Sequence, residues 1–143
     1  MNKQLYFNDM EVGMEVPALV KNPTSRQLVQ WAGASGDFNE IHYDKDYAIS
    51  TGLPGTIIHG RLRASFLGQL MTNLAGAEGY LKKFSCSYKA MDAPGSPLTC
   101  KGKVVRKYEK DGQGLIDCDI WIENARGEKT TEGKATVMLP YRK

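Results

Sequence analysis

Hydrophobic residues follow a helical spacing in the middle of the chain and alternate with polar residues after it. From Gly60 onward they recur every three or four residues, no proline occurs before Pro94, and Gly76 and Gly79 supply an exit. This pattern predicts one long, buried helix that begins at Gly60 and ends by Gly76. Its apolar positions are Leu62, Phe66, Leu67, Leu70, Met71 and Leu74.

Two shorter helices are predicted before the long one. Thr24, with Gln27 three residues later, is typical of a capping box and predicts a helix over residues 25–34. Asp44 has the position of a cap for a helix of two turns at most, closed by Gly52 and Pro54. A short strand is expected earlier still, near residues 18–21.

The chain after residue 83 reads as strands. Residues 84–90 alternate strictly between apolar and polar side chains, the period of a half-buried strand. Further strands are predicted over residues 98–108, around 116–123 and up to residue 139, with turns between them. These elements predict a single α+β domain over residues 1–143, in which an antiparallel meander curls around the long helix.

Composition excludes several classes of protein. The 143 residues are 41% hydrophobic and 24% charged, and no apolar run reaches the roughly 18 residues of a membrane span. The net charge of +3 is spread among acidic residues, which argues against a nucleic-acid partner. Residues 1–16 lack the apolar stretch of a secretory signal, so we expect a cytoplasmic protein. Three widely spaced cysteines are expected as reduced core residues.

Candidate chemistry gathers in residues 34–60, which hold both histidines of the chain. Asp37 and His42 are five residues apart and would not share a helix face, whereas Gly36 and Asn39 favour a loop that turns both side chains toward one place. Taken alone, such a pair is more often a turn beside a solvated imidazole.

A metal site is the competing interpretation of the same stretch, since Asp37, Asn39, His42 and Asp44 are all potential ligands. An EF-type calcium loop would need glycine where His42 stands, and a zinc site would need more His or Cys. We therefore expect no metal.

Residues 31–48, WAGASGDFNEIHYDKDYA, and residues 55–66, GTIIHGRLRASF, resemble the MaoC-like (R)-specific enoyl-CoA hydratases and dehydratases, which have the hot-dog fold. The pattern of that family reads SGDxNPIHxD, then an alanine, and later AHGM at the start of the central helix. The matching residues are Asp37, Asn39, Ile41, His42, Asp44, Ala48, His59 and Gly60. The sequence departs from the pattern at Glu40, where proline is usual, and at Arg61, where methionine is usual.

The resemblance implies reversible hydration of trans-2-enoyl thioesters of CoA or of an acyl carrier protein, without a cofactor. Asp37 and His42 would hold one water and act as base and acid, in roles that the sequence leaves open. The backbone N–H of Gly60 would form the oxyanion hole at the amino end of the helix. Asn39 would brace the loop or the dyad rather than react. His59 would bond backbone near the helix start, with a second acid or base as its alternative role.

Other readings stay open beside this one. The family implies a homodimer with the substrate channel at its interface, and a hetero-dimer with a related subunit is an alternative. The protein could instead be a thioesterase, or a non-catalytic acyl-CoA-binding partner subunit.

Arg61 and Arg63 stand in the first turn of the predicted long helix, where cations oppose the helix dipole. One of them could contact an acyl carboxylate or a carrier phosphate, or form a salt bridge or a subunit contact.

Overall fold

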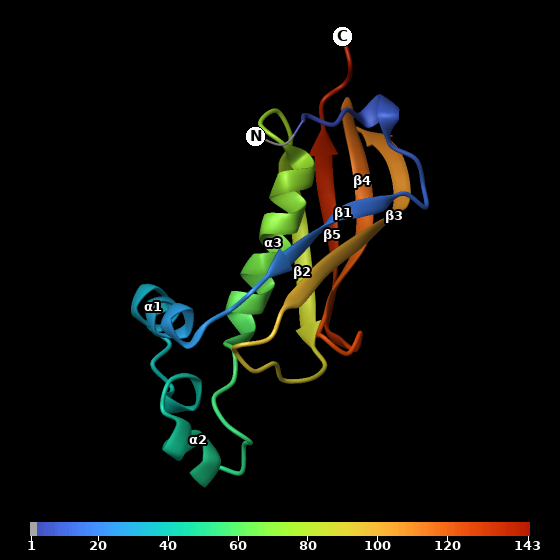
Figure 1. Cartoon of the computed structure of the whole chain (residues 1–143). Coiled ribbons are helices and arrows are strands. Elements are labelled where there is room, and N and C mark those ends of the chain that lie inside the picture. The colour runs from blue at the N-terminus through green and yellow to red at the C-terminus, as the bar shows by residue number, and fades with distance from the viewer. Residues whose placement is uncertain (1–2) are drawn as a thin grey trace.

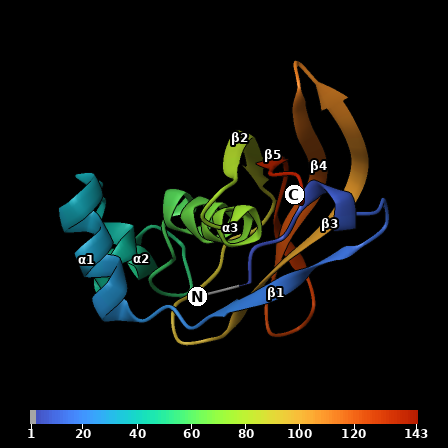
Figure 2. The same cartoon turned by 90° about the horizontal axis from the view of Figure 1, so that it is seen from above.

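Five antiparallel strands form one curved sheet, and the longest helix lies across the inner face of that sheet (Figures 1 and 2). The structure is a computed structural model and describes residues 3–143. The helical elements are η1 (Phe7–Asp9), α1 (Ser25–Ser35), η2 (Glu40–His42), α2 (Lys45–Ser50) and α3 (Gly60–Ala75). The strands are β1 (Glu15–Lys21), β2 (Tyr80–Tyr88), β3 (Leu98–Lys110), β4 (Gln113–Glu123) and β5 (Lys129–Leu139).

Helix α3 confirms the prediction of a long, buried helix. All six apolar positions named from its spacing are less than 5% exposed, and they pack against the inward side chains of the sheet. On β4 these inward residues alternate as predicted: Ile116, Cys118, Ile120 and Ile122 are all buried. None of the helices in residues 3–143 combines the length and hydropathy that a bilayer span requires.

The strand order differs from the predicted meander. It runs β1-β3-β4-β5-β2, so β3, β4 and β5 follow one another while β2 lies at the far edge beside β5. Alternation along β2 identifies a strand but does not identify its neighbour, because the partner β5 follows only after β3 and β4. The bounds also differ, since β1 begins at Glu15 and β2 covers Tyr80–Tyr88. Strands β1 and β2 are the two open edges.

Helices α1 and α2 lie beside the end of the molecule where α3 begins (Figures 1 and 2). Both caps predicted from the sequence are present, because the Thr24 hydroxyl accepts from the Gln27 N–H at 3.2 Å and the Asp44 carboxylate accepts from the Tyr47 N–H at 2.9 Å. Gly36 ends α1 in the left-handed conformation, with φ of 77°. These short elements deliver the loop that carries Asp37 to the start of α3.

The three cysteines are unpaired. Cys100 and Cys118 are buried in the core, and Cys86 is half-buried and packs against it. Burial raises the pKa of the Cys100 and Cys118 thiols to about 12, which keeps both protonated at neutral pH.

Candidate active site

The loop between α1 and η2 is built from successive side-chain bonds to backbone. The Asp37 carboxylate accepts from the Asn39 N–H at 3.4 Å, and the Asn39 side-chain oxygen accepts from the Ile41 N–H at 3.2 Å, which caps η2. The expected irregular loop is therefore present. The Asn39 side chain caps the short helix that carries His42.

Asp37 and His42 lie together at the surface end of this loop. The distance from His42 Nε2 to Asp37 Oδ2 is 3.8 Å, with side chains 9% and 45% exposed respectively. His42 Nδ1 lies 2.7 Å from the carbonyl oxygen of Ile57. Because a carbonyl can only accept, Nδ1 carries a proton, so in the neutral form of the ring Nε2 presents a lone pair toward Asp37.

His59 supports both members of this pair. Its Nε2 donates to the backbone carbonyl of Asp37 at 3.2 Å, and its ring stacks on that of His42 with centroids 3.7 Å apart. The side chain is fully buried. Burial lowers the pKa of the His59 imidazole, and neighbouring His42 lowers it further against opposing effects of Asp37. The ring bonds backbone as expected, although the backbone belongs to the Asp37 loop rather than to the helix start.

Gly60 opens α3 directly after His59. Within residues 3–143 no carbonyl accepts the Gly60 N–H, as is usual for the first turn of a helix. The aromatic ring of Tyr88 lies against the Gly60 Cα, so an added Cβ would come within 2.9 Å of Tyr88 Cε2. An unpaired N–H at the positive end of a buried helix suits a developing oxyanion. The sequence did not point to Tyr88, because nothing local links the end of β2 to Gly60.

The arrangement combines a loop carboxylate, an imidazole and a helix amino terminus. A family model described as the MaoC like domain matches residues 8–119 of the chain. The chain belongs to the MaoC-like family. The sequence resemblance at residues 31–48 and 55–66 is thereby confirmed at the level of the family.

Named relatives of this MaoC-like chain extend over almost its whole length. It is 31% identical to the (R)-specific enoyl-CoA hydratase of Rhodospirillum rubrum, with 96% of this chain and 93% of the relative covered. It is 30% identical to the enzyme of the same name from Aeromonas caviae, with 92% and 96% covered. The 3-hydroxybutyryl-CoA dehydratase of Methylorubrum extorquens is 26% identical, with 95% and 85% covered.

Solved structures confirm the hot-dog architecture of the MaoC-like chain. The (R)-hydratase from A. caviae superimposes with a TM-score of 0.83 at 27% identity, covering 92% of this chain and 98% of that one. The unliganded R-hydratase PhaJ1 from Pseudomonas aeruginosa gives a TM-score of 0.88 at 22% identity, with 97% and 88% covered. The α+β prediction, with a sheet wrapped around one central helix, is therefore correct.

The two arginines of the first α3 turn differ completely in environment. Arg61 is exposed and forms no ion pair with any residue between positions 3 and 143. Arg63 is buried, and its guanidinium lies 3.0 Å from the Asp92 carboxylate. The alternative that Arg63 contacts a substrate anion is wrong for this arrangement, because an internal carboxylate already neutralises it. Arg61 is left as the one candidate of the two.

Asp37, His42 and His59 also form the kind of cluster that can bind a metal, with ligand atoms within 4.8 Å of one another. Two features disfavour an ion there. His42 Nδ1 and His59 Nε2 are already bonded to backbone carbonyls. The two rings are stacked with only 21° between their planes, so an ion shared by their other nitrogens would lie well out of both planes, whereas imidazole binds metals in the plane.

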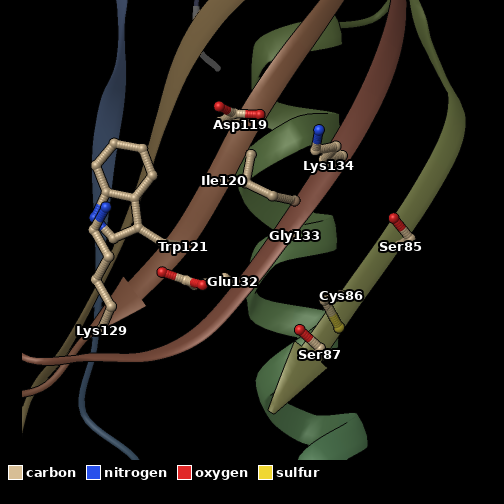
Figure 3. A pocket seen from close by; sticks show the side chains of 10 residues that line it. All are labelled: Ser85, Cys86, Ser87, Asp119, Ile120, Trp121, Lys129, Glu132, Gly133 and Lys134. Carbon is tan, nitrogen blue, oxygen red and sulfur yellow. The ribbon is translucent and has the colours of Figure 1, made fainter. Parts of the chain in front are cut away.

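A hollow of about 580 Å³ lies elsewhere, on the face of the sheet turned away from α3 (Figure 3). On strands β4 and β5, which line it, Asp119 lies opposite Lys134, and the ammonium group of Lys129 lies 4.4 Å from the centre of the Trp121 ring. No residue of the Asp37 loop or the start of α3 lines it. The hollow is therefore separate from the candidate active site.

Proposed function

We propose that this MaoC-like protein hydrates trans-2-enoyl-CoA to (R)-3-hydroxyacyl-CoA, and catalyses the reverse dehydration, without a cofactor. The observation that carries the proposal is the 3.8 Å separation of His42 Nε2 and Asp37 Oδ2 in the loop that faces the amino terminus of α3. The two (R)-specific hydratases and the dehydratase among its relatives support this choice of reaction.

The two side chains are suited to hold one water molecule. Their facing atoms are too far apart for a direct hydrogen bond, but a water at about 2.8 Å from each fits between them. A carboxylate and the bare Nε2 of a neutral imidazole are both acceptors, so this water donates one hydrogen to each. Its lone pairs then point away from the protein groups, toward a substrate carbon.

In the proposed addition, one water molecule supplies both the hydroxyl group at C3 and the hydrogen at C2. The water oxygen bonds to C3 of the enoyl group while one O–H bond breaks, and the π electrons move toward the thioester oxygen. A proton returns to C2 as that electron density comes back, so the product gains one hydroxyl and one hydrogen. The proton that leaves the water is taken up by the Asp37–His42 pair and the same pair delivers it to C2, with the assignment of base and acid left open.

Gly60 supplies the donor for the thioester oxygen in this proposal. Its N–H has no acceptor among residues 3–143, and the absence of a Cβ permits close approach of the thioester. The positive end of the α3 dipole favours the negative charge that develops there. Asn39 and His59 act as supports, through the loop bonds and the stacked ring described above.

The test is an assay with crotonyl-CoA, following loss of the enoyl absorbance, release of free thiol and the configuration of the product. We expect hydration to the (R) product without thiol release, and a fall of roughly 10²- to 10⁴-fold in Asp37→Asn and in His42→Ala. Release of free thiol would instead indicate a thioesterase. Binding of crotonyl-CoA with neither reaction would indicate a non-catalytic partner subunit.

A homodimer is part of the same proposal. Strand β2 is an open edge, and the side chains of Tyr88 at its end and Phe38 beside the dyad are 46% and 58% exposed. A second copy paired along this edge would cover apolar surface next to the site. Light scattering on the purified protein tests this; a monomer at micromolar concentration would contradict it, and a requirement for a second, related chain would point to the hetero-dimer.

The exposed Arg61 is proposed to select the substrate. It stands next to Gly60 with no internal partner in the described chain, in a position where a cation works against the helix dipole. A carboxylate on the acyl group, or a phosphate of the CoA or carrier-protein arm, would compensate this charge.

A further inference from the structure

A buried ion pair lies next to the start of α3. Arg63 and Asp92 are 4% and 5% exposed, and Arg63 Nη1 donates to Asp92 Oδ2 at 3.0 Å. The same nitrogen donates to the Ala90 carbonyl at 2.6 Å. The Thr130 hydroxyl donates to Asp92 Oδ2, also at 2.6 Å. This network joins the first turn of α3 to the segment after β2 and to the second residue of β5.

A contribution to folding stability does not by itself explain the buried Arg63–Asp92 ion pair. Moving two charges out of water is costly, and replacing a buried ion pair by apolar residues of similar volume is often neutral or stabilising. Among residues 3–143, Arg63 and Asp92 form the one ion pair in which both side chains are less than 10% exposed. Its place at the first turn of α3, directly after His59 and Gly60, suggests a geometric function.

The backbone of Asp92 is bonded directly to the segment that holds His42. The Asp92 carbonyl accepts from the Ile58 N–H at 2.8 Å. The preceding residue, Ile57, accepts from His42 Nδ1 at 2.7 Å and donates its N–H to the Ile41 carbonyl at 3.1 Å. Residues 57–60 are therefore held on one side by the dyad loop and on the other by Asp92.

A second contact leads from Arg63 to the oxyanion donor. The guanidinium carbon of Arg63 lies 5.1 Å from the centre of the Tyr88 ring. That ring in turn occupies the space beside the Gly60 Cα, so close that an added Cβ would lie 2.9 Å from Tyr88 Cε2. Displacement of Arg63 would thus free both Tyr88 and the segment that ends at Gly60.

We propose that Arg63 and Asp92 are positioning residues, whose ion pair sets the placement of His42 Nε2 relative to the Gly60 N–H. They act through Ile57, Ile58 and Tyr88. The proposal rests on the proposed hydratase function for its kinetic consequence, but its structural part can be measured independently of any activity.

The deciding variant removes both charges together. In Arg63→Met/Asp92→Leu no unpaired charge is left buried, so the protein should fold with a melting temperature equal to or above that of the wild type. Misplacement of reacting groups by an ångström can cost about 100-fold, so we expect kcat for crotonyl-CoA to fall 10- to 100-fold with KM changed less than about 3-fold. If the double variant does not fold, Thr130→Val removes one bond to Asp92 without changing charge, and a smaller fall in kcat with unchanged KM is expected.

The matched control is Lys101→Met/Glu123→Leu, which removes another ion pair, of 2.8 Å, that joins β3 to β4 away from the site. This control should keep wild-type kcat. The second readout is the ring Nδ1–H resonance of His42 in protein labelled with ¹⁵N-histidine. It reports the bond to Ile57, and it should shift or broaden in Arg63→Met/Asp92→Leu but not in the control.

Wild-type kcat in a folded Arg63→Met/Asp92→Leu protein would overturn the proposal, because the ion pair would then be a structural element only. An unmoved His42 resonance would overturn it as well. A wild type that folds but hydrates no enoyl thioester would refute the proposed function, and the resonance would still decide whether the pair positions His42.

Discussion

Substitution of Gly60 by alanine should separate catalysis from stability. The new Cβ would lie 2.9 Å from Tyr88 Cε2 and 3.0 Å from Tyr88 Cζ, so the tyrosine ring must move. That ring is 46% exposed on an edge strand and can turn toward solvent at a cost of about 1 kcal/mol. Alanine at a helical position offsets this by roughly 0.4–1 kcal/mol. The two effects nearly cancel, and the melting temperature should change by less than about 6 °C.

Activity should respond far more strongly. The methyl group would stand beside the N–H that is proposed to bind the thioester oxygen, and loss of one oxyanion donor costs about 10²- to 10³-fold in kcat. We expect kcat/KM for crotonyl-CoA to fall about 100-fold, which corresponds to roughly 2.7 kcal/mol of transition-state stabilisation.

Two further variants decide what causes the loss. Gly68→Ala lies in the same helix with no atom within 4 Å of the new Cβ, so it should raise stability by about 1 kcal/mol and leave kcat/KM unchanged. Gly60→Ala/Tyr88→Ala removes the clash. If the double variant has the same kcat/KM as Tyr88→Ala alone, the displaced ring and not the oxyanion site causes the loss, and the reasoning about Gly60 is refuted. Unchanged activity in Gly60→Ala would refute it directly.

Three other outcomes are expected. Because the pKa of folded His59 lies below its ordinary value of 6.5, the unfolded chain binds more protons between the two values, and stability present above pH 6.5 is lost as pH falls through that window. His59→Gln should therefore flatten the pH dependence of the free energy of unfolding in urea between pH 8 and 5. An unaltered pH dependence would contradict a lowered pKa of His59. Arg61→Met should lower the ratio of kcat/KM for a carboxylated enoyl-CoA over crotonyl-CoA by roughly 10-fold, or about 1.4 kcal/mol; an unchanged ratio sinks the idea that Arg61 binds a carboxylate. Iodoacetamide at pH 8 should label Cys86 in the folded protein but not Cys100 or Cys118, whose pKa burial raises to about 12, and mass spectrometry showing early labelling of either buried thiol would contradict this.

Much of the fold could be predicted from local patterns. The spacing of apolar residues in α3, the Thr24 and Asp44 caps and the alternation along β4 all identified elements that the structure contains. Each of these signals depends on residues within a few positions of one another. The place of β2 at the far edge could not be predicted in this way, because its partner β5 is separated from it along the chain by β3 and β4.

The candidate site, like the fold, could be predicted from the sequence only where it depends on residues close together in the chain. By itself the sequence determined the residues with suitable chemistry, since the motifs around Asp37, His42 and Gly60 are contiguous and their loop is built from local side-chain bonds. Only the tertiary structure decided how they are supported. The bond from His42 to Ile57 and the pairing of Arg63 with Asp92 span 15 and 29 residues, and Tyr88 reaches Gly60 from another element. Such contacts leave no periodic signal, because they follow from how a curved sheet packs against one helix rather than from the order of residues.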